Sequence, residues 1–363
     1  MEASKAGRLL LVGFAPEEIQ EVECLAREER LGGVILFERN ARSATELGDL
    51  TARLAPKEPQ GACPLMVALD QELGRVCRIR QGVTLFPGAP ELGFLDRPAT
   101  TLRVARWVAL ELMELGVHLN LAPVADVPQG PPFPSVLQGR TFGQDPAKVA
   151  SHVTFWVRGS QRAGLACCVK HFPGHGSVQE DSHLELPVDP SPLHLMKTHH
   201  LVPFEAAFKA EVASVMLSHV LYPELDPQWP ASLSSRIVQG LLRKRLGFRG
   251  LVITDDLEME AVACSMGALE AAVRAICAGT DMVLVGRNLK AAVGLTQLVE
   301  GLEKAVVNKE IPRERFEEAL GRSLSFKARW VHSTARRRAA SPPMGAKRLA
   351  GKLFREVMTC RGS

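Results

Sequence analysis

Short runs of apolar residues recur along the chain and alternate with longer stretches in which apolar and polar positions follow a helical period. Most runs are apolar throughout, as expected for parallel strands that are covered on both faces. Strand–helix alternation of this kind predicts an α/β fold, and eight repeats of it predict a (β/α)8 TIM-type barrel. The predicted strands span Leu9–Phe14, Gly33–Phe37, Leu65–Asp70, Val117–Ala122, Leu165–Val169, Ser214–Ser218, Leu251–Thr254 and Met282–Val285.

A doubly wound parallel sheet is the alternative α/β architecture. Its dinucleotide-binding version carries a GxGxxG turn after the first strand, and no such turn follows Phe14. The barrel is therefore the favoured prediction. The predicted helices span Pro16–Glu29, Ala44–Leu54, Thr101–Leu115, Pro146–Ala163, Pro203–Glu211, Ser235–Leu246, Glu258–Ala278 and Leu289–Val306.

The end of the chain differs in composition from the rest. We predict a catalytic domain over residues 1–332, with a last helix from Pro312 to about Trp330, and a basic tail over residues 333–363 that is flexible or forms a short helix. The tail carries eight Lys and Arg residues and one Glu, which gives it a formal charge of +7. Since the whole chain has a formal net charge of +4, the remainder carries 4 − 7 = −3. An acidic body does not favour nucleic acid, so no nucleic-acid partner is expected. The tail could contact nucleic acid or a membrane, but Ser341-Pro342-Pro343 favours a solvated extension.

The overall composition is that of a globular protein, with 46% hydrophobic and 23% charged residues. No apolar run has the length of a membrane span, and the N-terminus lacks the ordered parts of a signal peptide. None of the eight cysteines belongs to a CxxC pair, and a disulfide framework is not expected around so large a core. We therefore expect a cytoplasmic protein without a membrane span that acts as a monomer.

Polar side chains follow five consecutive predicted strands. In a (β/α)8 barrel the C-terminal strand ends surround one opening, where the active sites of this fold lie. These side chains should therefore face a common site, although any one alone could form a surface ion pair or cap a helix. The groups are Asp70, Gln71 and Glu72 with Arg75 and Arg78; Asn120 and Asp126; Lys170 and His171; Ser218 and His219; and Thr254, Asp255 and Asp256.

The segment from Lys170 to His183 holds the densest group of ionisable residues, with KHFPGHG at 170–176 and DSH at 181–183. Pro173 and the two glycines exclude a regular helix, so these groups lie on a loop. His and Asp are common zinc ligands, but an HxxxH pair brings both rings together only on a helix. No metal site is therefore predicted, and no GxxxxGK[ST] loop indicates a phosphate-bearing cofactor.

The remaining candidate chemistry is the hydrolysis of a glycoside. It needs a carboxylate nucleophile on one side of the anomeric carbon and a proton donor on the other. We assign Asp255 as the nucleophile and His183 as the acid and base, because an imidazole titrates near neutral pH, with Asp181 orienting the ring. Hydrogen bonds to sugar hydroxyls are expected from Asp70, Arg78, Arg140, Lys170 and His171, whose charge strengthens such bonds.

These motifs resemble those of a known family. From about residue 8 to 330 the chain is similar to the bacterial β-N-acetylhexosaminidases of glycoside hydrolase family 3, of the cytosolic type that recycles peptidoglycan. The KHFPGHGxxxxDSH loop together with TDDLEM at 254–259 is highly specific for that family. The other segments that carry the resemblance are Gly32–Phe37, Asp70–Glu72, Leu119–Val127, Gly139–Gly143, Ser218–Pro223 and Pro230–Ser234.

The resemblance implies retention through a covalent glycosyl-enzyme on Asp255, an Asp181–His183 acid/base dyad, and no metal or organic cofactor. It implies release of N-acetylglucosamine from muropeptides or chito-oligosaccharides. The chain departs from the family pattern at one position, because the family has two glycines after Gln-Glu and here Leu73 precedes Gly74. The turn that presents Arg75 and Arg78 is therefore expected to differ.

Two other functions stay open. A neutral imidazole does not repel an incoming anion as a carboxylate would, so phosphate could compete with water and make the protein a β-N-acetylglucosaminide phosphorylase. The chain could also be a non-catalytic sugar-binding barrel, because a fold does not fix a function. The presence of Asp255 together with Asp181 and His183 argues against the silent barrel.

Overall fold

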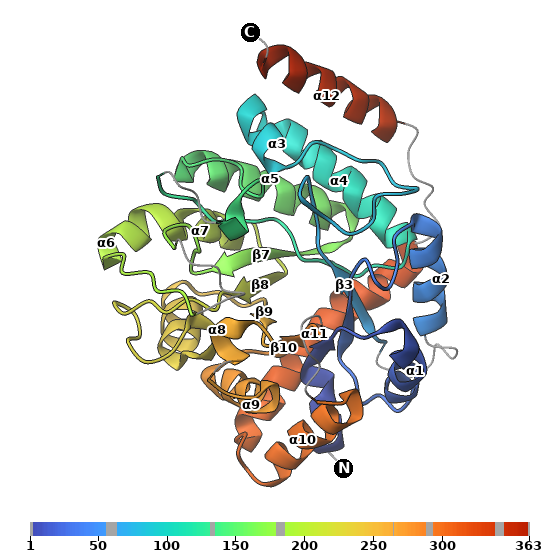
Figure 1. Ribbon diagram of the computed structural model, residues 1–363, viewed down its shortest axis with the longest axis vertical. Coiled ribbons are helices and arrows are strands. Elements are labelled where there is room, and N and C mark those ends of the chain that lie inside the picture. Colours follow the sequence, from blue (N-terminus) through green and yellow to red (C-terminus); the bar gives the residue numbers. More distant parts are fainter. Residues whose placement is uncertain are drawn as a thin grey trace.

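The structure is a computed structural model that describes residues 3–55, 64–130, 135–178, 186–263, 265–287, 293–337 and 345–361. Eight parallel strands form a closed barrel in the order β1-β10-β9-β8-β7-β6-β3-β2 (Figure 1). The predicted (β/α)8 barrel is confirmed, and closure of the sheet excludes the doubly wound alternative. The barrel strands are β1 (Leu10–Val12), β2 (Gly33–Leu36), β3 (Met66–Leu69), β6 (Leu119–Asn120), β7 (Ala166–Phe172), β8 (Ser214–Leu217), β9 (Leu251–Asp256) and β10 (Met282–Val285).

Helices surround the barrel and connect successive strands (Figure 1). The α-helices are α1 (Ile19–Arg27), α2 (Ala44–Leu54), α3 (Ala89–Leu95), α4 (Pro98–Glu114), α5 (Pro146–Ala163), α6 (Leu193–Leu195), α7 (Leu201–Lys209), α8 (Glu260–Ala263), α9 (Ala268–Ala278), α10 (Leu295–Val307), α11 (Arg313–Arg337) and α12 (Ala346–Arg361). Short 3-10 helices are η1 (Ala3–Leu9), η2 (Pro16–Glu18), η3 (Ser135–Leu137) and η5 (Ala231–Leu233), and π-helical segments are η4 (Met196–His200) and η6 (Arg236–Arg245).

Some predicted helix bounds are wrong. The helix expected over Glu258–Ala278 is two helices, α8 and α9, because Gly267 has an extended backbone (φ −69°, ψ 156°) at the start of α9. Helix α4 begins at Pro98, ahead of the predicted Thr101, since proline is well suited to the first helical turn. A small antiparallel hairpin, β4 (Gln71–Leu73) with β5 (Val76–Cys77), was not expected, because two or three residues show no period.

The interior of the barrel is filled by apolar side chains that point inward from the strands. Helix α11 completes this layer from below, because Phe326, Trp330 and Val331 pack against it. The same helix lies beside Ala213 and Leu251, where β8 and β9 begin. The N-terminal end of the barrel is therefore closed by α11, and the opposite end is left for the site. The strand residues of this layer include Leu11, Ile35, Met66, Leu119, Met216, Ile253 and Leu284.

A buried charge cluster, which we call the floor cluster, reinforces the closed end. Asp281 immediately precedes β10, is fully buried, and accepts hydrogen bonds from Arg243 (2.5 Å), Arg315 (3.1 Å) and Arg322 (3.1 Å). Its Oδ2 atom also accepts the backbone N–H of Val252 at 2.9 Å. One carboxylate therefore joins η6, α11 and β9 at the barrel floor.

The C-terminal segment is helical where the structure describes it. Helix α11 continues to Arg337, so the domain boundary predicted at residues 332/333 lies inside a helix. Helix α12 lies within the basic tail predicted over residues 333–363, for which a short helix was one of the two expectations, and it packs on α3. No helix in the described ranges is both long and apolar enough to cross a membrane. The six cysteines in these ranges are free thiols.

Candidate active site

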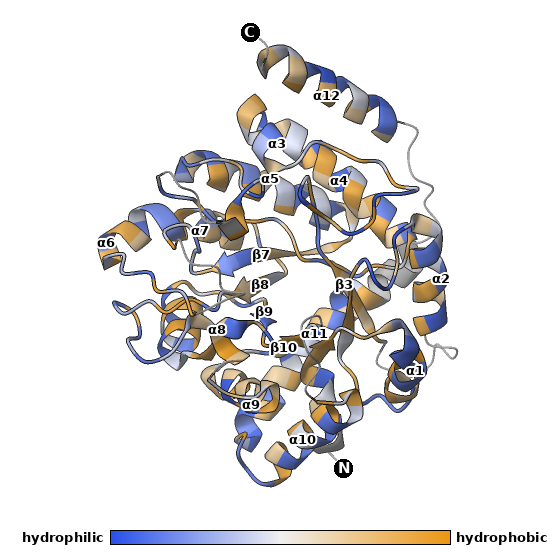
Figure 2. Ribbon diagram, viewed as in Figure 1, coloured by the Kyte–Doolittle hydropathy of each residue, from blue (hydrophilic) through white to orange (hydrophobic). Residues whose placement is uncertain are grey.

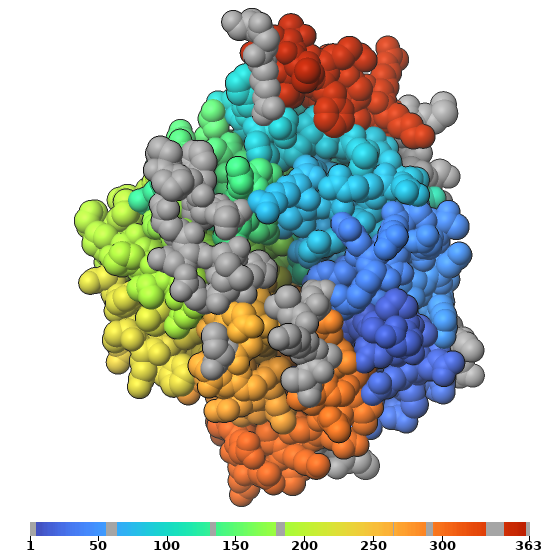
Figure 3. Space-filling model, in the orientation of Figure 1, coloured from blue at the N-terminus to red at the C-terminus, as the bar shows by residue number. Residues whose placement is uncertain are grey.

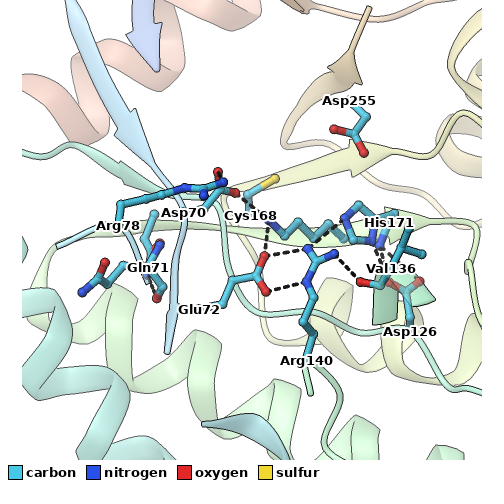
Figure 4. A network of polar contacts seen from close by, with 12 residues as sticks. Asp70, Gln71, Glu72, Arg78, Asp126, Val136, Arg140, Cys168, His171 and Asp255 are labelled. Atoms are coloured by element: carbon cyan, nitrogen blue, oxygen red, sulfur yellow. Dashed lines mark hydrogen bonds and ion pairs between the residues drawn. The ribbon is translucent and has the colours of Figure 1, made fainter. Parts of the chain in front are cut away.

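Polar side chains from several strand ends meet at the open end of the barrel (Figure 4). Lys170, from β7, is almost fully buried, and its Nζ atom lies 2.7 Å from Asp70 Oδ1 and 2.6 Å from Glu72 Oε1. Asp70 and Glu72 follow β3 directly. The Gln71 N–H donates to the Asn120 side chain at 2.9 Å, which ties the ends of β3 and β6 together. The predicted convergence of strand-end groups is thus observed for β3, β6 and β7.

Two arginines extend this group, which we call the mouth cluster. Arg140 forms two parallel hydrogen bonds with Glu72, at 2.8 Å from Nε and 2.7 Å from Nη2. Arg78 donates to Asp70 Oδ2 at 3.2 Å. Leu73 and Gly74 have positive φ angles of 73° and 63° in the hairpin turn, so the side chain at Leu73 does not prevent the turn from bringing Arg78 to Asp70. Figure 4 shows Glu72 between Arg140 and the strand end that carries Asp70.

Burial and pairing have opposite effects on these charges. Burial alone would raise the pKa of Asp70 and of Glu72, but the neighbouring cations lower both pKa values below their usual range. Burial would lower the pKa of Lys170, yet Asp70 and Glu72 raise it above its ordinary value. The mouth cluster is therefore ionised throughout the neutral range, and its charges are available for strong hydrogen bonds to a polar ligand.

His171 is held by a buried carboxylate. Asp126 is fully buried and accepts from the backbone N–H of His171 at 3.2 Å, from the His171 ring Nδ1 at 2.7 Å and from the backbone N–H of His175 at 2.7 Å. Because Nδ1 donates to Asp126, Nε2 presents a lone pair towards Arg140, 3.5 Å away. Burial would raise the pKa of Asp126, but its interactions with His171 and His175 lower that pKa below its ordinary value. Asp126 thus fixes both the orientation and the tautomer of His171.

The loop that follows β7 forms hydrogen bonds with neighbouring segments up to residue 178, where this described range ends. Tyr222 donates to the Gly174 carbonyl at 2.6 Å, and the Gln129 N–H donates to the Gly176 carbonyl at 2.9 Å. Ser177 Oγ lies 2.8 Å from His200 Nε2. The prediction that Lys170 and His171 lie on a loop is wrong, because β7 continues to Phe172; the loop begins at Pro173 and is observed up to residue 178. Asp181 and His183, the predicted acid/base dyad, lie outside the described residues.

Asp255 is the second-last residue of β9. Figure 4 shows its carboxylate on the side of His171, apart from the ion pairs of the mouth cluster. Among the described residues, this carboxylate accepts one hydrogen bond, from the backbone N–H of Asp256 at 2.9 Å. Burial would raise the pKa of Asp255, but His171 and the Asp256 amide bring it below its ordinary value. Asp255 is therefore an ionised carboxylate with unused acceptor capacity that faces the mouth cluster.

The neighbouring Asp256 has a different environment. Its Oδ1 atom accepts the backbone N–H groups of Gly286 (2.8 Å) and Glu258 (3.1 Å), so it holds the loops after β9 and β10. Burial raises the pKa of Asp256 to about 7. His219 Nε2 donates to the Asp256 carbonyl at 3.0 Å while Ser232 donates to Nδ1, and burial lowers the pKa of this histidine. The pKa is thus lowered at Asp255 and raised at its neighbour Asp256. Such a difference between two nearby carboxylates allows them to take different chemical roles.

Residues 2–326 match the model of the glycosyl hydrolase family 3 N-terminal domain. The chain belongs to glycosyl hydrolase family 3. It is 39% identical over 286 residues to a β-hexosaminidase of Stenotrophomonas maltophilia, a match that covers 76% of this chain and 83% of that protein. It is therefore a glycoside hydrolase, as the sequence motifs predicted.

Solved structures agree with this membership. A family 3 β-N-acetylglucosaminidase from Paenibacillus is 34% identical and superposes with a TM-score of 0.88 over 97% of this chain and 68% of that chain. A β-N-acetylhexosaminidase from Beutenbergia cavernae is 32% identical, with a TM-score of 0.78 over 90% of this chain and 98% of that one.

Within this family 3 barrel the structure brings together the predicted sugar contacts Asp70, Arg78, Arg140, Lys170 and His171. It adds Glu72 and Asp126, to which the sequence assigned no role. The sequence shows both as polar residues that follow strands, but it does not show that Glu72 pairs with Arg140 and Lys170 or that Asp126 pairs with His171. In the described ranges, no group of three or more His, Cys, Asp or Glu side chains could hold a metal ion.

Proposed function

We propose that this protein is a retaining exo-β-N-acetylglucosaminidase that forms a covalent glycosyl-enzyme on Asp255. The observation that carries the proposal is the contrast between two neighbouring carboxylates. Asp255 has a lowered pKa and faces the mouth cluster, whereas Asp256 has a pKa of about 7 and is committed to two backbone amides. A nucleophile must be ionised and unencumbered, and only Asp255 meets both conditions.

The sugar would be held by the mouth cluster. Asp70 and the His171 Nε2 atom can accept hydrogen bonds from hydroxyl groups, while Lys170, Arg78 and Arg140 can donate them. The similar β-hexosaminidases and β-N-acetylglucosaminidases support N-acetylglucosamine as this sugar. In the proposed mechanism His183 protonates the leaving oxygen, and later deprotonates the attacking water, with Asp181 stabilising the imidazolium.

The nucleophile is tested by Asp255→Asn, with Asp256→Asn as the matched control. We expect Asp255→Asn to lower kcat on a chromogenic N-acetylglucosaminide on the order of 10⁴-fold or more, because no covalent intermediate can form. Asp256→Asn should retain most of the activity at neutral pH. If Asp255→Asn kept wild-type turnover while Asp256→Asn lost it, the assignment of the nucleophile would be wrong.

The dyad is tested by leaving-group dependence. His183→Ala should slow a disaccharide with a poor leaving group far more than an activated aryl glycoside, which needs little protonation. An equal loss of activity on both substrates would show that His183 is not the proton donor.

We also propose that muropeptides are the natural substrates. A higher kcat/KM on an N-acetylglucosaminyl-anhydromuramoyl peptide than on chitobiose would support this proposal.

The acceptor is tested separately in phosphate buffer and in a non-nucleophilic buffer. We expect free N-acetylglucosamine in both, as for a hydrolase. N-acetylglucosamine 1-phosphate as the main product in phosphate would instead identify a phosphorylase, and no turnover in any buffer would identify a non-catalytic sugar-binding barrel.

A further inference from the structure

Helix α12 separates apolar and basic side chains onto opposite faces. Leu349, Leu353 and Val357 are buried, at 7%, 3% and 3% exposure, on the side that packs against α3. The single acid, Glu356, lies 2.8 Å from Arg97 and 3.6 Å from Lys352 and is thereby compensated. Four cations are exposed on the outer side: Lys347, Arg348, Lys352 and Arg355.

Helix α4 extends this basic surface. A Cβ atom at Gly345 would lie 3.5 Å from the Trp107 ring of α4, so the start of α12 lies against that helix. Arg103 and Arg106 of α4 are exposed, and Arg103 shares a helix face with Trp107, four residues further on. Figure 3 shows α12 lying directly over the surface formed by α3 and α4. We call the combined surface the α4–α12 face: Arg97, Arg103, Arg106, Lys347, Arg348, Lys352 and Arg355.

Two large apolar side chains stand among these cations. Phe354 is 44% exposed and Met358 is 72% exposed, and they lie one helical turn apart. Lys347 precedes Phe354 by two turns, so all three share one side of α12. Figure 2 shows hydrophilic and hydrophobic residues alternating along α12. Cations interspersed with exposed aromatic and aliphatic side chains are the composition of helices that lie at a lipid interface.

We propose that the α4–α12 face docks this protein on an anionic phospholipid bilayer. The charge distribution supports the orientation: the face has seven cations and one acid, Glu356, so it carries 7 − 1 = +6, and the remainder of the chain carries 4 − 6 = −2. An anionic surface therefore attracts the face and repels the remainder. Helix α12 is straight and about 24 Å long, so its outer side can lie flat on a plane. A lipid surface offers apolar partners to Phe354 and Met358, which the phosphate backbone of a nucleic acid does not.

The docking is electrostatic with a small apolar component. Each Lys or Arg near an anionic membrane contributes about a fivefold gain in partitioning. The apolar face of α12 stays packed on the barrel, so binding is reversible and leaves the enzyme folded. Since the interaction depends on charges at the surface, it weakens as the Debye length falls from about 10 Å at 0.1 M salt to about 3 Å at 1 M.

The test is sedimentation of the full chain with vesicles of phosphatidylglycerol and phosphatidylcholine, in 100 mM and in 1 M NaCl. The fourfold variant Lys347→Glu, Arg348→Glu, Lys352→Glu and Arg355→Glu should bind at least about 600-fold more weakly than the native chain, because four fivefold gains are lost. A second variant, Phe354→Ser with Met358→Ser, should weaken binding about 10-fold at unchanged charge. Both should keep native activity on a chromogenic N-acetylglucosaminide.

A matched control carries the same charge change elsewhere, with Arg27, Lys244, Arg245 and Lys304 replaced by Glu. These exposed cations lie on α1, η6 and α10, and Figure 1 shows α1 and α10 away from α12. The control should bind anionic vesicles within about threefold of the native chain. Equal loss in the control and the α12 variant, or equal binding to pure phosphatidylcholine vesicles, would overturn the proposal. So would binding to a DNA duplex as tight as to anionic vesicles and insensitive to Phe354 and Met358, which would identify a general polyanion surface.

Discussion

Both ends of the barrel bury charges, and the two clusters use their hydrogen-bonding capacity differently. In the floor cluster, Asp281 accepts four hydrogen bonds, and Arg243 and Arg315 also donate to backbone carbonyls, while Arg243 Nε has no hydrogen-bond partner within the part of the chain that the structure describes. In the mouth cluster, carboxylates and cations pair mainly with one another, and Asp255 stands beside them with a free oxygen. The floor carboxylate is saturated by protein donors, whereas Asp255 at the mouth has an oxygen left for a ligand.

The largest expected effect comes from breaking the floor cluster. Asp281→Asn leaves the buried guanidinium groups of Arg243 and Arg315 and the partly exposed Arg322 without their shared counter-charge, so the free energy of unfolding should fall by about 3–5 kcal/mol. Chemical denaturation measures this loss, and kcat/KM at low temperature should be unchanged. Glu317→Gln is the control, because its exposed pair with Arg313 should contribute less than about 1 kcal/mol. Equal losses in the two variants would contradict the stabilising role of the floor.

Asp256, at the open end of the barrel, should make the stability of the protein depend on pH. The pKa of Asp256 is about 7 in the folded protein and near its ordinary value of 3.8 in the unfolded chain. Between these values the folded state binds the extra proton, so this group makes stability fall as pH rises from about 4 to 7, by up to about 4 kcal/mol. Asp256→Asn should remove that decline in a series of denaturation curves. An identical pH profile in the variant would show that Asp256 is ionised in the folded state.

Glu72 distinguishes binding from stability within the mouth. Glu72→Gln removes the charge that Arg140 and Lys170 share, so these two proposed sugar contacts lose their fixed positions. We expect kcat/KM to fall about 100-fold, mainly through KM, as for the loss of a charged hydrogen-bond network. Glu318→Gln, which removes a carboxylate from the floor arginines Arg315 and Arg322, should leave kcat/KM unchanged.

Arg78 should give the smallest effect. Its side chain is 28% exposed and makes a single 3.2 Å contact with Asp70. Arg78→Gln should raise KM about 10-fold, the value of one hydrogen bond to a charged group. Arg80→Gln, in the same exposed turn, should have no effect on KM. A larger loss for Arg78→Gln than for Glu72→Gln would reverse the order of importance proposed for the mouth cluster.

The sequence predicted the barrel well because its strands are buried on both faces and therefore appear as continuous apolar runs. All eight barrel strands lie within predicted runs or overlap them. The floor cluster escaped prediction because Asp281 and its partners Arg243, Arg315 and Arg322 are far apart in the chain and have no shared period. Helix α11 likewise gave a helical pattern but no sign that Trp330 would enter the barrel.

The mouth cluster was easier to predict from the sequence than the floor cluster, because strand ends in a barrel must meet around one opening. Their positions at strand ends alone predict that Asp70, Lys170 and His171 lie together. Glu72 and Asp126 occupied equally visible positions, but their function as holders of other side chains depends on distances that spacing does not give. The departure at Leu73 was also visible, and the structure shows its consequence as a positive φ angle in a bulky residue.

Helix α11 supplies both Trp330 and Val331 of the inner layer and two of the three arginines around Asp281. It is also the last element of the barrel to leave the ribosome. A nascent chain that contains all eight strands but lacks α11 has an open lower end, where Asp281 has Arg243 but neither Arg315 nor Arg322 as a partner. We therefore expect folding to be completed only after α11 is synthesised, and chains truncated before α11 to be substrates for proteolysis.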